Sequence, residues 1–415
     1  MINNFKTYTL NNGLTIYFYI DKKKHSTFVN LTTKFGGFTK YCTIDDKKYE
    51  LPDGLAHLLE HYVVEANSLG RYTEILWQHN MNTNASTGYH HTSYYFDTTN
   101  NLEFGIDILL RSCYSPVFKK ELLEEVKKPI YQEIKMYDDN KFTAFNKKQY
   151  ENIFTTHSFR SIGGSIEDLK QIDIKLLKLV YESFYHPSNQ ILIVAGNFNY
   201  KKVLKQIKNI YQQLDFPKHK LILLSPNEPK EVACKRSSIK LPTTKEYIEI
   251  AYKLDLSHFS KEELLKLDFY LHYLMKMNFS TPSTAYKNSL KQKLFDDGFT
   301  TEIAYFNQLG ILSIGSYTNY PSKLEKIIIN TIKNLEFNKN MFELYLKQSL
   351  TEVSVRPDSI HSMIKPFLDN VILFEYPTFD SIEYIKTWNF KDFKTLISRL
   401  DFSNYSTCIM QKDKK

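Results

Sequence analysis

The feature that most constrains the fold of this chain is a five-residue pattern, His57-x-x-Glu60-His61. Residues four apart lie on the same face of a helix, one turn from each other, so the two imidazoles point the same way if the segment is helical. Two such rings can hold one Zn²⁺ at about 2.0–2.1 Å each, and Glu60 between them is placed to take a proton from a bound water. The pattern therefore predicts a helix that carries a metal site.

The neighbouring residues favour such a helix. Asp53 is in position to cap its N-terminus, and we expect the helix within residues 51–67. The apolar side chains at helical spacing are Leu55, Leu58, Leu59 and Tyr62. A histidine pair and a glutamate beside this stripe are costly to bury without a partner, and a metal ion is one. The pattern also arises by chance in roughly a few per cent of chains this long, so a third ligand is needed to support it.

A tetrahedral catalytic zinc site has three protein ligands and leaves the fourth position to water. The best candidate for the third ligand is Glu133, which follows His61 by 72 residues and lies in a segment with helical character. A strand-like stretch at 82–98 and two helical stretches lie between them, which is enough chain to return a second helix to the first. From the spacing alone, an exposed helix carboxylate is the simpler interpretation of Glu133.

The order H-x-x-E-H marks the inverzincins. The chain resembles the pitrilysin/insulinase family of zinc peptidases, which includes the mitochondrial processing peptidase. The segments that carry the resemblance are 12–14, 52–54, 84–87, 132–139, 185–189 and 191–196. They cover residues 5–200 closely, whereas the second half matches in its pattern of elements.

The resemblance implies a function for each of these motifs. His57, His61 and Glu133 would bind Zn²⁺, and Glu60 would be the catalytic base. The edge strand along which the substrate lies would contain Asn84, Ala85 and Ser86. The implied protein is a zinc metalloendopeptidase that hydrolyses peptides or unfolded segments in a closed chamber, in peptide maturation or in general peptide turnover.

Length and composition indicate a globular protein of more than one domain, with 415 residues, 42 % of them hydrophobic. Turn-forming and charged residues between Phe216 and Lys230 predict a linker. We therefore expect a zinc-binding catalytic domain at 1–215, a linker at 216–232 and an inactive homologous domain at 233–415. The expected fold is α+β, with two homologous mixed α/β domains of the processing-peptidase type, which the resemblance makes half of a four-domain chamber.

The hydrophobic pattern places the main elements of both halves. Helices are expected at 51–67, 102–113, 119–137, 166–184, 261–276, 284–295 and 321–335. Single strands are expected at 14–20, 28–35, 190–195 and 247–254, with more than one strand within 81–98 and two within 304–317. The second half thus repeats the element order of the first. Its counterpart of the metal helix, residues 264–275, holds only His272, so we expect no metal there.

Composition also bears on location and partners. No apolar run approaches the roughly 20 residues of a membrane span, and the N-terminus has no hydrophobic signal region. The cysteines are scattered without a C-x-x-C pair: Cys42, Cys113, Cys234 and Cys408. This usage predicts a reducing cytoplasm. The net charge of +8 comes from dispersed lysines, so a nucleic-acid binder is supported by charge alone and is not favoured.

The chain departs from the family pattern at two places. Many relatives carry a second glutamate seven residues before the third ligand, where this chain has Val126 next to Glu124 and Glu125. Relatives also carry an arginine and a tyrosine in the second domain, and the corresponding positions here hold Phe295 and Thr301, with Tyr305 nearby. A phenylalanine cannot stabilise an oxyanion by charge or by a hydrogen bond.

The second departure leads to an expected partner. We expect a heterodimer with a paralogous subunit that supplies the Arg/Tyr pair, with a homodimer as the second choice. The alternative function is a non-catalytic or regulatory subunit of a peptidase-like heterodimer, which kept the H-x-x-E-H pattern and lost activity with the pair.

Overall fold

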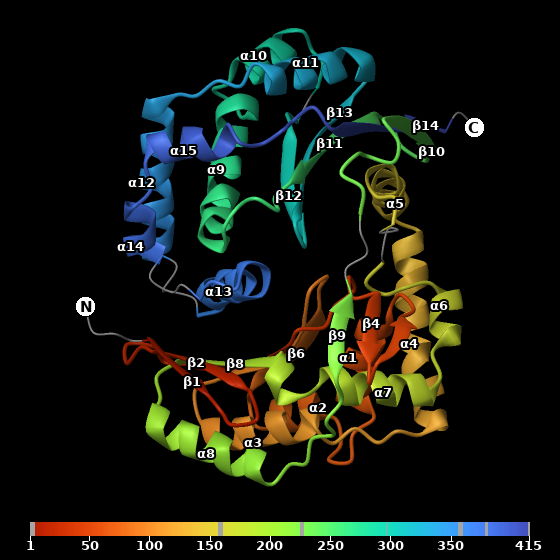
Figure 1. Ribbon diagram of the computed structural model, residues 1–415, viewed down its shortest axis with the longest axis vertical. Helices are drawn as coiled ribbons and strands as arrows, with labels where there is room; N and C mark the ends of the chain where they lie inside the picture. The colour runs from red at the N-terminus through yellow and green to blue at the C-terminus, as the bar shows by residue number, and fades with distance from the viewer. Residues whose placement is uncertain are drawn as a thin grey trace. The chain divides into compact units, whose positions relative to one another are not determined.

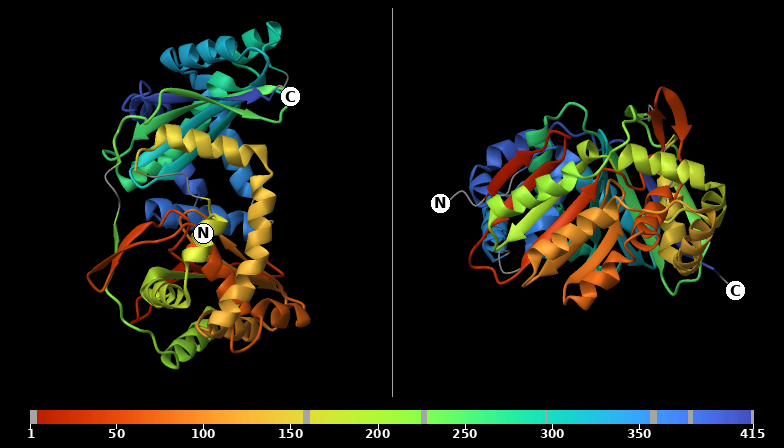
Figure 2. Two further views of the ribbon diagram at one scale, coloured as in Figure 1. Left: turned by 90° about the vertical axis from the view of Figure 1, so that its right-hand side faces the viewer. Right: turned by 90° about the horizontal axis from the view of Figure 1, so that it is seen from below.

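The computed structural model describes residues 5–156, 161–224, 228–295, 297–355, 360–377 and 381–413. The chain forms two compact units, each assembled from more than one stretch of sequence. Unit 1 comprises residues 1–137, 160–225 and 359–365, and unit 2 comprises residues 138–159, 226–358 and 366–415. Both units combine one main β-sheet with helices (Figures 1 and 2).

Unit 1 is built on a six-stranded sheet with the order β1-β2-β8-β3-β7-β6. Its strands are β1 (Phe5–Thr9), β2 (Thr15–Ile20), β3 (Thr27–Thr33), β6 (Asn82–Thr87), β7 (Thr92–Thr98) and β8 (Gln190–Gly196). Strands β2 and β8 are parallel, and the other pairs are antiparallel. Every residue of β3 and β8 is buried, as expected for the middle of a covered sheet, whereas β6 is an edge strand.

The helices of unit 1 cover this sheet. They are α1 (Leu55–Glu65), α2 (Tyr72–Gln78), α3 (Leu102–Cys113), α4 (Lys120–Asp138), α6 (Ile166–Gln171), α7 (Ile174–Phe184), the short helix η1 (Pro187–Asn189) and α8 (Tyr200–Gln212). Helices α3 and α8 lie side by side on one face of the sheet (Figures 1 and 2). A small second sheet has the order β5-β4-β9, with β4 (Tyr41–Ile44), β5 (Lys47–Glu50) and β9 (Leu221–Leu224).

Unit 2 is built on a five-stranded sheet with the order β10-β14-β11-β13-β12. Its strands are β10 (Arg236–Leu241), β11 (Glu246–Asp255), β12 (Thr300–Phe306), β13 (Leu309–Thr318) and β14 (Tyr405–Lys412). Its helices are α5 (Lys141–Ile153), α9 (Lys261–Phe279), α10 (Thr284–Lys291), α11 (Pro321–Lys333), α12 (Lys339–Val355), α14 (Ser381–Lys386) and α15 (Phe390–Ile397), while α13 (Ile360–Phe374) crosses the division between the units. Helices α5 and α9 lie on opposite sides of the sheet in Figure 1. The mixed α/β architecture with two such units confirms the expected fold class.

Several expected elements differ in detail. The first strand of the chain is β1, which precedes the expected strand at 14–20. Residues 166–184 form two helices, because the side chain of Asp173 accepts a hydrogen bond from the Leu176 N–H and starts α7 anew. Helix α10 ends at Lys291, short of the expected 295. Strand β9 lies inside the segment 216–232 and pairs with β4.

The sequence predicts no apolar run long enough for a membrane-spanning helix. In the part of the chain that the structure describes, no helix combines the length and the apolar character that crossing a bilayer requires.

Candidate functional site

Helix α1 presents the histidine pair because its other face is anchored in the core of unit 1. The buried side chains of that face are Leu55, Leu58, Leu59, Tyr62 and Val63. The helix begins after Gly54, whose φ of 81° lies in the left-handed region, and a Cβ there would stand 2.5 Å from the carbonyl oxygen of Gly163. Only glycine fits this position without strain. The expected cap at Asp53 is wrong, since Gly54 is the N-cap and no side chain caps the helix.

Glu133 reaches the histidines from α4. The core-facing side of α4 carries Val126, Ile130 and Ile134 at four-residue spacing, and all three are buried. Glu133 precedes Ile134 and is just over one-third exposed, so its carboxylate lies at the border between core and solvent. The packing of α4 thus brings a partly solvated carboxylate to the face of α1 that holds His57 and His61.

The structure brings the three expected ligands together. His57 Nε2 lies 3.6 Å from Glu133 Oε2, and His61 Nε2 lies 3.8 Å from Glu133 Oε1. Ligand atoms in a tetrahedral zinc site with bonds of about 2.0–2.1 Å are about 3.3 Å apart. Among the residues that the structure describes, these three form the one group of histidine, cysteine and acidic side chains whose ligand atoms all lie within 4.8 Å of one another.

The two histidines differ in protonation. Burial, and then the charge of His61, lower the pKa of His57 to about 4, so this ring is neutral near pH 7. Its Nδ1 is buried and has no hydrogen-bond partner among the described residues. Burial alone would lower the pKa of His61, but the contact with Glu65 and the charges of Glu60 and Glu133 outweigh it, and its pKa is raised.

Glu60 is nearly buried and is held by a neighbour from the sheet. Its side chain is 9 % exposed, and Oε2 accepts a hydrogen bond of 2.5 Å from Thr87 Oγ1. Burial raises the pKa of Glu60, and the bond from Thr87 opposes that shift. A carboxylate with a raised pKa beside two histidines has the properties of a general base.

The expected substrate strand runs beside this group. Asn84, Ala85 and Ser86 belong to β6, the edge strand of the main sheet, and β6 packs against α1. Asn84 and Ser86 are exposed. The Ala85 N–H donates to Asn84 Oδ1 at 2.9 Å. Because Thr87 ends the same strand, β6 connects this edge to Glu60.

The position of the family's second glutamate is apolar here. Val126 is buried in the core. Glu124 lies 3.1 Å from Lys127 Nζ and Glu125 lies 2.6 Å from Lys128 Nζ, so both carboxylates are paired along their own helix. Neither carboxylate therefore lies at the position of Val126, where many relatives carry the second glutamate.

The aromatic replacement in unit 2 is a core residue. Phe295 is buried, with its ring 5.1 Å from Tyr286 and 4.9 Å from Phe299. Thr301 is exposed on β12. The nearby Tyr305 donates a hydrogen bond of 2.8 Å to Asp268. Phe295, Thr301 and Tyr305 therefore do not provide the positive charge of the arginine that relatives carry in this domain.

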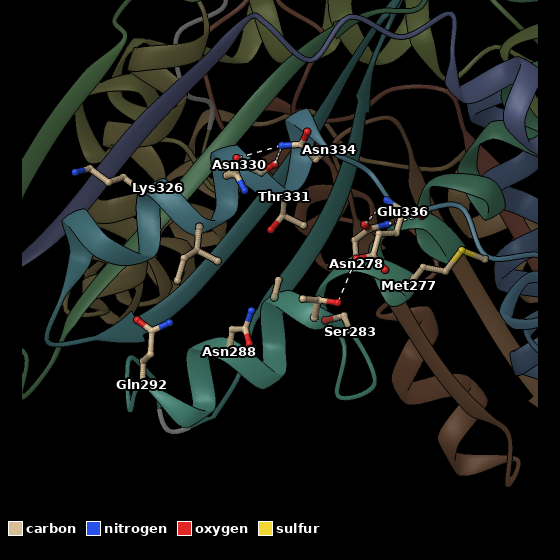
Figure 3. Close-up of a pocket in the computed structure, with 13 residues that line it drawn as sticks. Met277, Asn278, Ser283, Asn288, Gln292, Lys326, Asn330, Thr331, Asn334 and Glu336 are labelled. Atoms are coloured by element: carbon tan, nitrogen blue, oxygen red, sulfur yellow. Dashed lines mark hydrogen bonds between the residues drawn. The ribbon is translucent and has the colours of Figure 1, made fainter.

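A cavity of about 360 Å³ lies in unit 2, away from the histidine pair. It lies between the C-terminal end of α9 and helices α10 and α11, and amide and hydroxyl groups line most of it (Figure 3). Asn278 in its wall is satisfied, because its side chain donates to Leu274 O and accepts from the Glu336 N–H. None of the three candidate ligands lines this cavity, and all three belong to unit 1.

The sequence-based site omitted residues that contact the histidines and Glu60. Thr87 was part of a recognised segment, but its bond to Glu60 depends on how β6 packs on α1. Glu65 lies with Oε1 at 3.6 Å from His61 Nδ1, and Arg71 lies 3.7 Å from the same oxygen. Glu65 had a local signal, because it follows His61 by four residues, the spacing that also pairs the two histidines.

Comparison with known proteins identifies two domains of one peptidase family in this chain. Residues 46–163 match the family model described as Insulinase (Peptidase family M16), and residues 171–348 match the model described as Peptidase M16 inactive domain. The uncharacterized zinc protease YmfH of Bacillus subtilis (strain 168) is 27 % identical over 323 residues, which cover 77 % of this chain and 75 % of YmfH.

Two solved structures show the same fold. An M16-like peptidase from Alicyclobacillus acidocaldarius superposes with a TM-score of 0.90 at 23 % identity, over 99 % of this chain and 98 % of that one. The periplasmic protease PqqL from Escherichia coli superposes with a TM-score of 0.77 at 12 % identity, over 100 % of this chain and 46 % of PqqL. With both domain types matched in order and a zinc protease as a relative, the chain belongs to the insulinase family, peptidase family M16.

Proposed function

We propose that this protein is the zinc-binding subunit of an endopeptidase that hydrolyses peptides or unfolded segments. The observation that carries the proposal is the convergence of His57, His61 and Glu133 from two helices, with Glu60 between the histidines on α1. Two imidazoles and one carboxylate are the donor set of several catalytic zinc sites. Relatives named as zinc proteases support the same assignment.

The residues present fit a zinc ion. The Nε2 atoms of both rings face the carboxylate of Glu133 at distances that a small contraction brings to tetrahedral spacing. His57 is neutral near pH 7, the form in which a histidine binds a metal. The partly exposed Glu133 leaves one side of the group open toward solvent.

Each nearby residue has a defined task in peptide hydrolysis. A zinc ion bound there would supply a Lewis acid that polarises the scissile carbonyl and acidifies a water. Glu60 accepts the proton of the attacking water and returns it to the leaving nitrogen. Thr87 holds the Glu60 carboxylate in place. The free edge of β6 at Asn84, Ala85 and Ser86 binds the extended substrate through its main chain, so side-chain identity matters little.

The active assembly in this proposal contains a second subunit. Phe295 is buried in the core and Thr301 carries no charge, so this chain offers no arginine at those positions to support an oxyanion. We assign that role to a paralogous partner that carries an Arg/Tyr pair, with a homodimer as the second choice. The whole assembly would enclose the substrate between more domains than this chain contributes.

The reducing cytoplasm remains our proposed location. Cys42, Cys113 and Cys408 are buried thiols, Cys234 is exposed, and none of the four forms a disulfide in the structure. Such usage is typical of proteins kept in a reducing compartment.

Hydrolysis of an internally quenched peptide tests the function. We expect cleavage by the zinc-loaded chain, loss of cleavage with a chelator, and faster cleavage when a short paralogous subunit is co-purified. The isolated chain should be slow, because losing one oxyanion donor typically costs about 10²–10³-fold in rate. A chain that binds zinc but cleaves nothing, alone or with any paralogue, would support the non-catalytic subunit instead.

A further inference from the structure

The two histidines of the candidate metal site have different neighbours at Nδ1, the ring nitrogen that does not face Glu133. The Nε2 atoms of both rings face Glu133. His61 Nδ1 faces Glu65 Oε1 at 3.6 Å, whereas His57 Nδ1 is buried and has no hydrogen-bond partner among the described residues. Among the described residues, a carboxylate thus contacts Nδ1 of His61 but not Nδ1 of His57.

This contact bears on which nitrogen of His61 is available. A neutral imidazole has one N–H and one lone pair, and the hydrogen bond made by one nitrogen decides the state of the other. A carboxylate accepts and does not donate when ionised, so Glu65 favours a proton on Nδ1 and leaves the lone pair on Nε2. That tautomer is the one with its lone pair toward Glu133. The 3.6 Å separation is a charge contact, and a shift of roughly half an ångström makes it a hydrogen bond.

Glu65 has its own support. It is the last residue of α1, where a negative charge is unfavourable because the helix dipole is negative at that end. Arg71 Nη2 lies 3.7 Å from Glu65 Oε1, and Arg71 Nη1 lies 3.0 Å from Glu74. Arg71 therefore offsets the unfavourable position of the Glu65 carboxylate and limits where it can move. Glu65 is 28 % exposed and Arg71 is 49 % exposed, so the support from Arg71 is weakened by solvent.

Helix α4 does not supply a substitute. The inward position seven residues before Glu133 is Val126, an aliphatic side chain in the core. Glu124 and Glu125 pair with Lys127 and Lys128 on their own helix. The carboxylate that contacts His61 from outside the ligand set is thus on α1 itself.

We propose that Glu65, supported by Arg71, is a positioning residue that holds the His61 ring with its Nε2 lone pair toward the metal. The proposal rests on the proposed zinc site at His57, His61 and Glu133. It assigns Glu65 no contact with substrate. The general expectation for such outer partners is a 10- to 100-fold effect on metal affinity.

Zinc affinity of the full chain, measured by competition with a chromophoric chelator, tests the proposal. We expect Glu65→Ala to bind zinc about 10- to 100-fold more weakly than the natural chain. Glu65→Gln should lose less, because its amide oxygen still accepts from Nδ1–H, and Arg71→Met should lose less again. The matched control is Asp107→Asn on α3, a carboxylate that pairs with Arg111 at 2.8 Å instead of with a histidine; it should change nothing.

The ¹⁵N chemical shifts of the His61 ring give a second readout that a merely structural role would not move. In the metal-free chain two carboxylates compete for the ring proton of His61, Glu65 at Nδ1 and Glu133 at Nε2. At a pH where the ring is neutral, we expect the fraction with the proton on Nδ1 to fall in Glu65→Ala, because Glu133 then has no competitor. If Glu65→Ala does not fold, Glu65→Leu, which removes the acceptor and keeps most of the side-chain volume, is judged by the same two measurements. Unchanged affinity and an unchanged tautomer in folded variants would overturn the positioning role while zinc binding by the natural chain stands. A natural chain that binds no more zinc than His57→Ala would overturn the proposed function itself.

Discussion

Thr87 Oγ1 on β6 donates a hydrogen bond of 2.5 Å to Glu60 Oε2 on α1. This bond connects the strand proposed to bind substrate to the carboxylate proposed to act as base. Glu60 is 9 % exposed, so its carboxylate has little access to water and the bond from Thr87 is the stronger for it. The geometry of the base therefore depends on the packing of an edge strand.

Replacing Thr87 tests this connection. Thr87→Val keeps the shape and removes the donor, and a hydrogen bond to a charged group is worth about 1.5–3 kcal/mol. We expect kcat to fall roughly 10- to 100-fold with little change in KM. Thr87→Ser keeps the hydroxyl and is the control, so it should stay within a few-fold of the natural chain. Equal kcat in the valine and serine variants would show that the bond does not serve the base.

Removing the base itself should stop turnover without removing the metal. Glu60→Gln is nearly isosteric but cannot accept a proton, so we expect activity on a quenched peptide to drop by at least about 10²-fold. Zinc content, measured on the same sample, should be unchanged. Near-normal turnover in this variant would mean that another group activates the water.

A buried ion pair in unit 2 predicts a large effect on stability. Lys253 Nζ lies 2.8 Å from Glu228 Oε1 and also donates to the carbonyl oxygens of Ile153 and Glu231, each at 3.0 Å. Both side chains of the pair are almost fully buried. In Lys253→Met the Glu228 carboxylate keeps its hydrogen bonds from Thr155 and Thr156 but is buried without its cation. We expect a loss of about 3–5 kcal/mol in the free energy of unfolding, measured in urea.

The double variant Lys253→Met/Glu228→Gln is the matched control for that pair. It removes both charges, so it should recover a substantial part of the loss. A double variant as unstable as Lys253→Met alone would show that the uncompensated charge is not the cause.

Glu249 on β11 predicts a pH dependence of stability. Burial, reinforced by the charge of Glu302 and opposed by a hydrogen bond with Ser313, raises the pKa of Glu249 to about 7. Between about pH 4.5 and 7 the folded chain then holds a proton that the unfolded chain has lost. The contribution of this group to stability is therefore full below its unfolded pKa and is lost as the pH rises through about 7.

Glu249→Gln should remove that part of the pH dependence, because an amide does not titrate. Urea unfolding at pH 5 and pH 7.5 should show a smaller decline for this variant than for the natural chain. Glu246→Gln changes a carboxylate of the same strand and should keep the decline. An identical decline in all three chains would contradict the assignment to Glu249.

The part of the site that lies on one helix could be predicted from the sequence. His57, Glu60 and His61 are placed by helical spacing, which depends on local geometry alone, and the structure has them on α1. Glu133 could not be placed by spacing, because the intervening chain can return α4 in many ways, and only the likeness to known peptidases selected it. Thr87 was missed as a partner of Glu60 for the same reason, since the contact joins separate elements.

The start of α1 shows a second limit of sequence-based prediction. Asp53 has the composition of a cap, but the helix starts at Gly54 because that residue packs against the backbone at Gly163 in the left-handed conformation. A close approach between two loops far apart in the chain leaves no periodic pattern in either. The strands β3 and β8, by contrast, consist mostly of apolar or β-branched residues, with Asn30 and Gln190 as the exceptions apart from Gly196, and they were expected close to their observed bounds.

Zinc content of the purified chain, measured by mass spectrometry with His57→Ala and Glu133→Ala alongside, tests the central claim most directly. The account predicts about one zinc ion per natural chain and a clear loss of zinc in both variants, because three ligands from two helices share one ion. Full zinc retention in Glu133→Ala and Glu133→Gln alike would remove Glu133 from the ligand set. A natural chain that holds no more zinc than His57→Ala would contradict the metal site, and with it the proposed peptidase function.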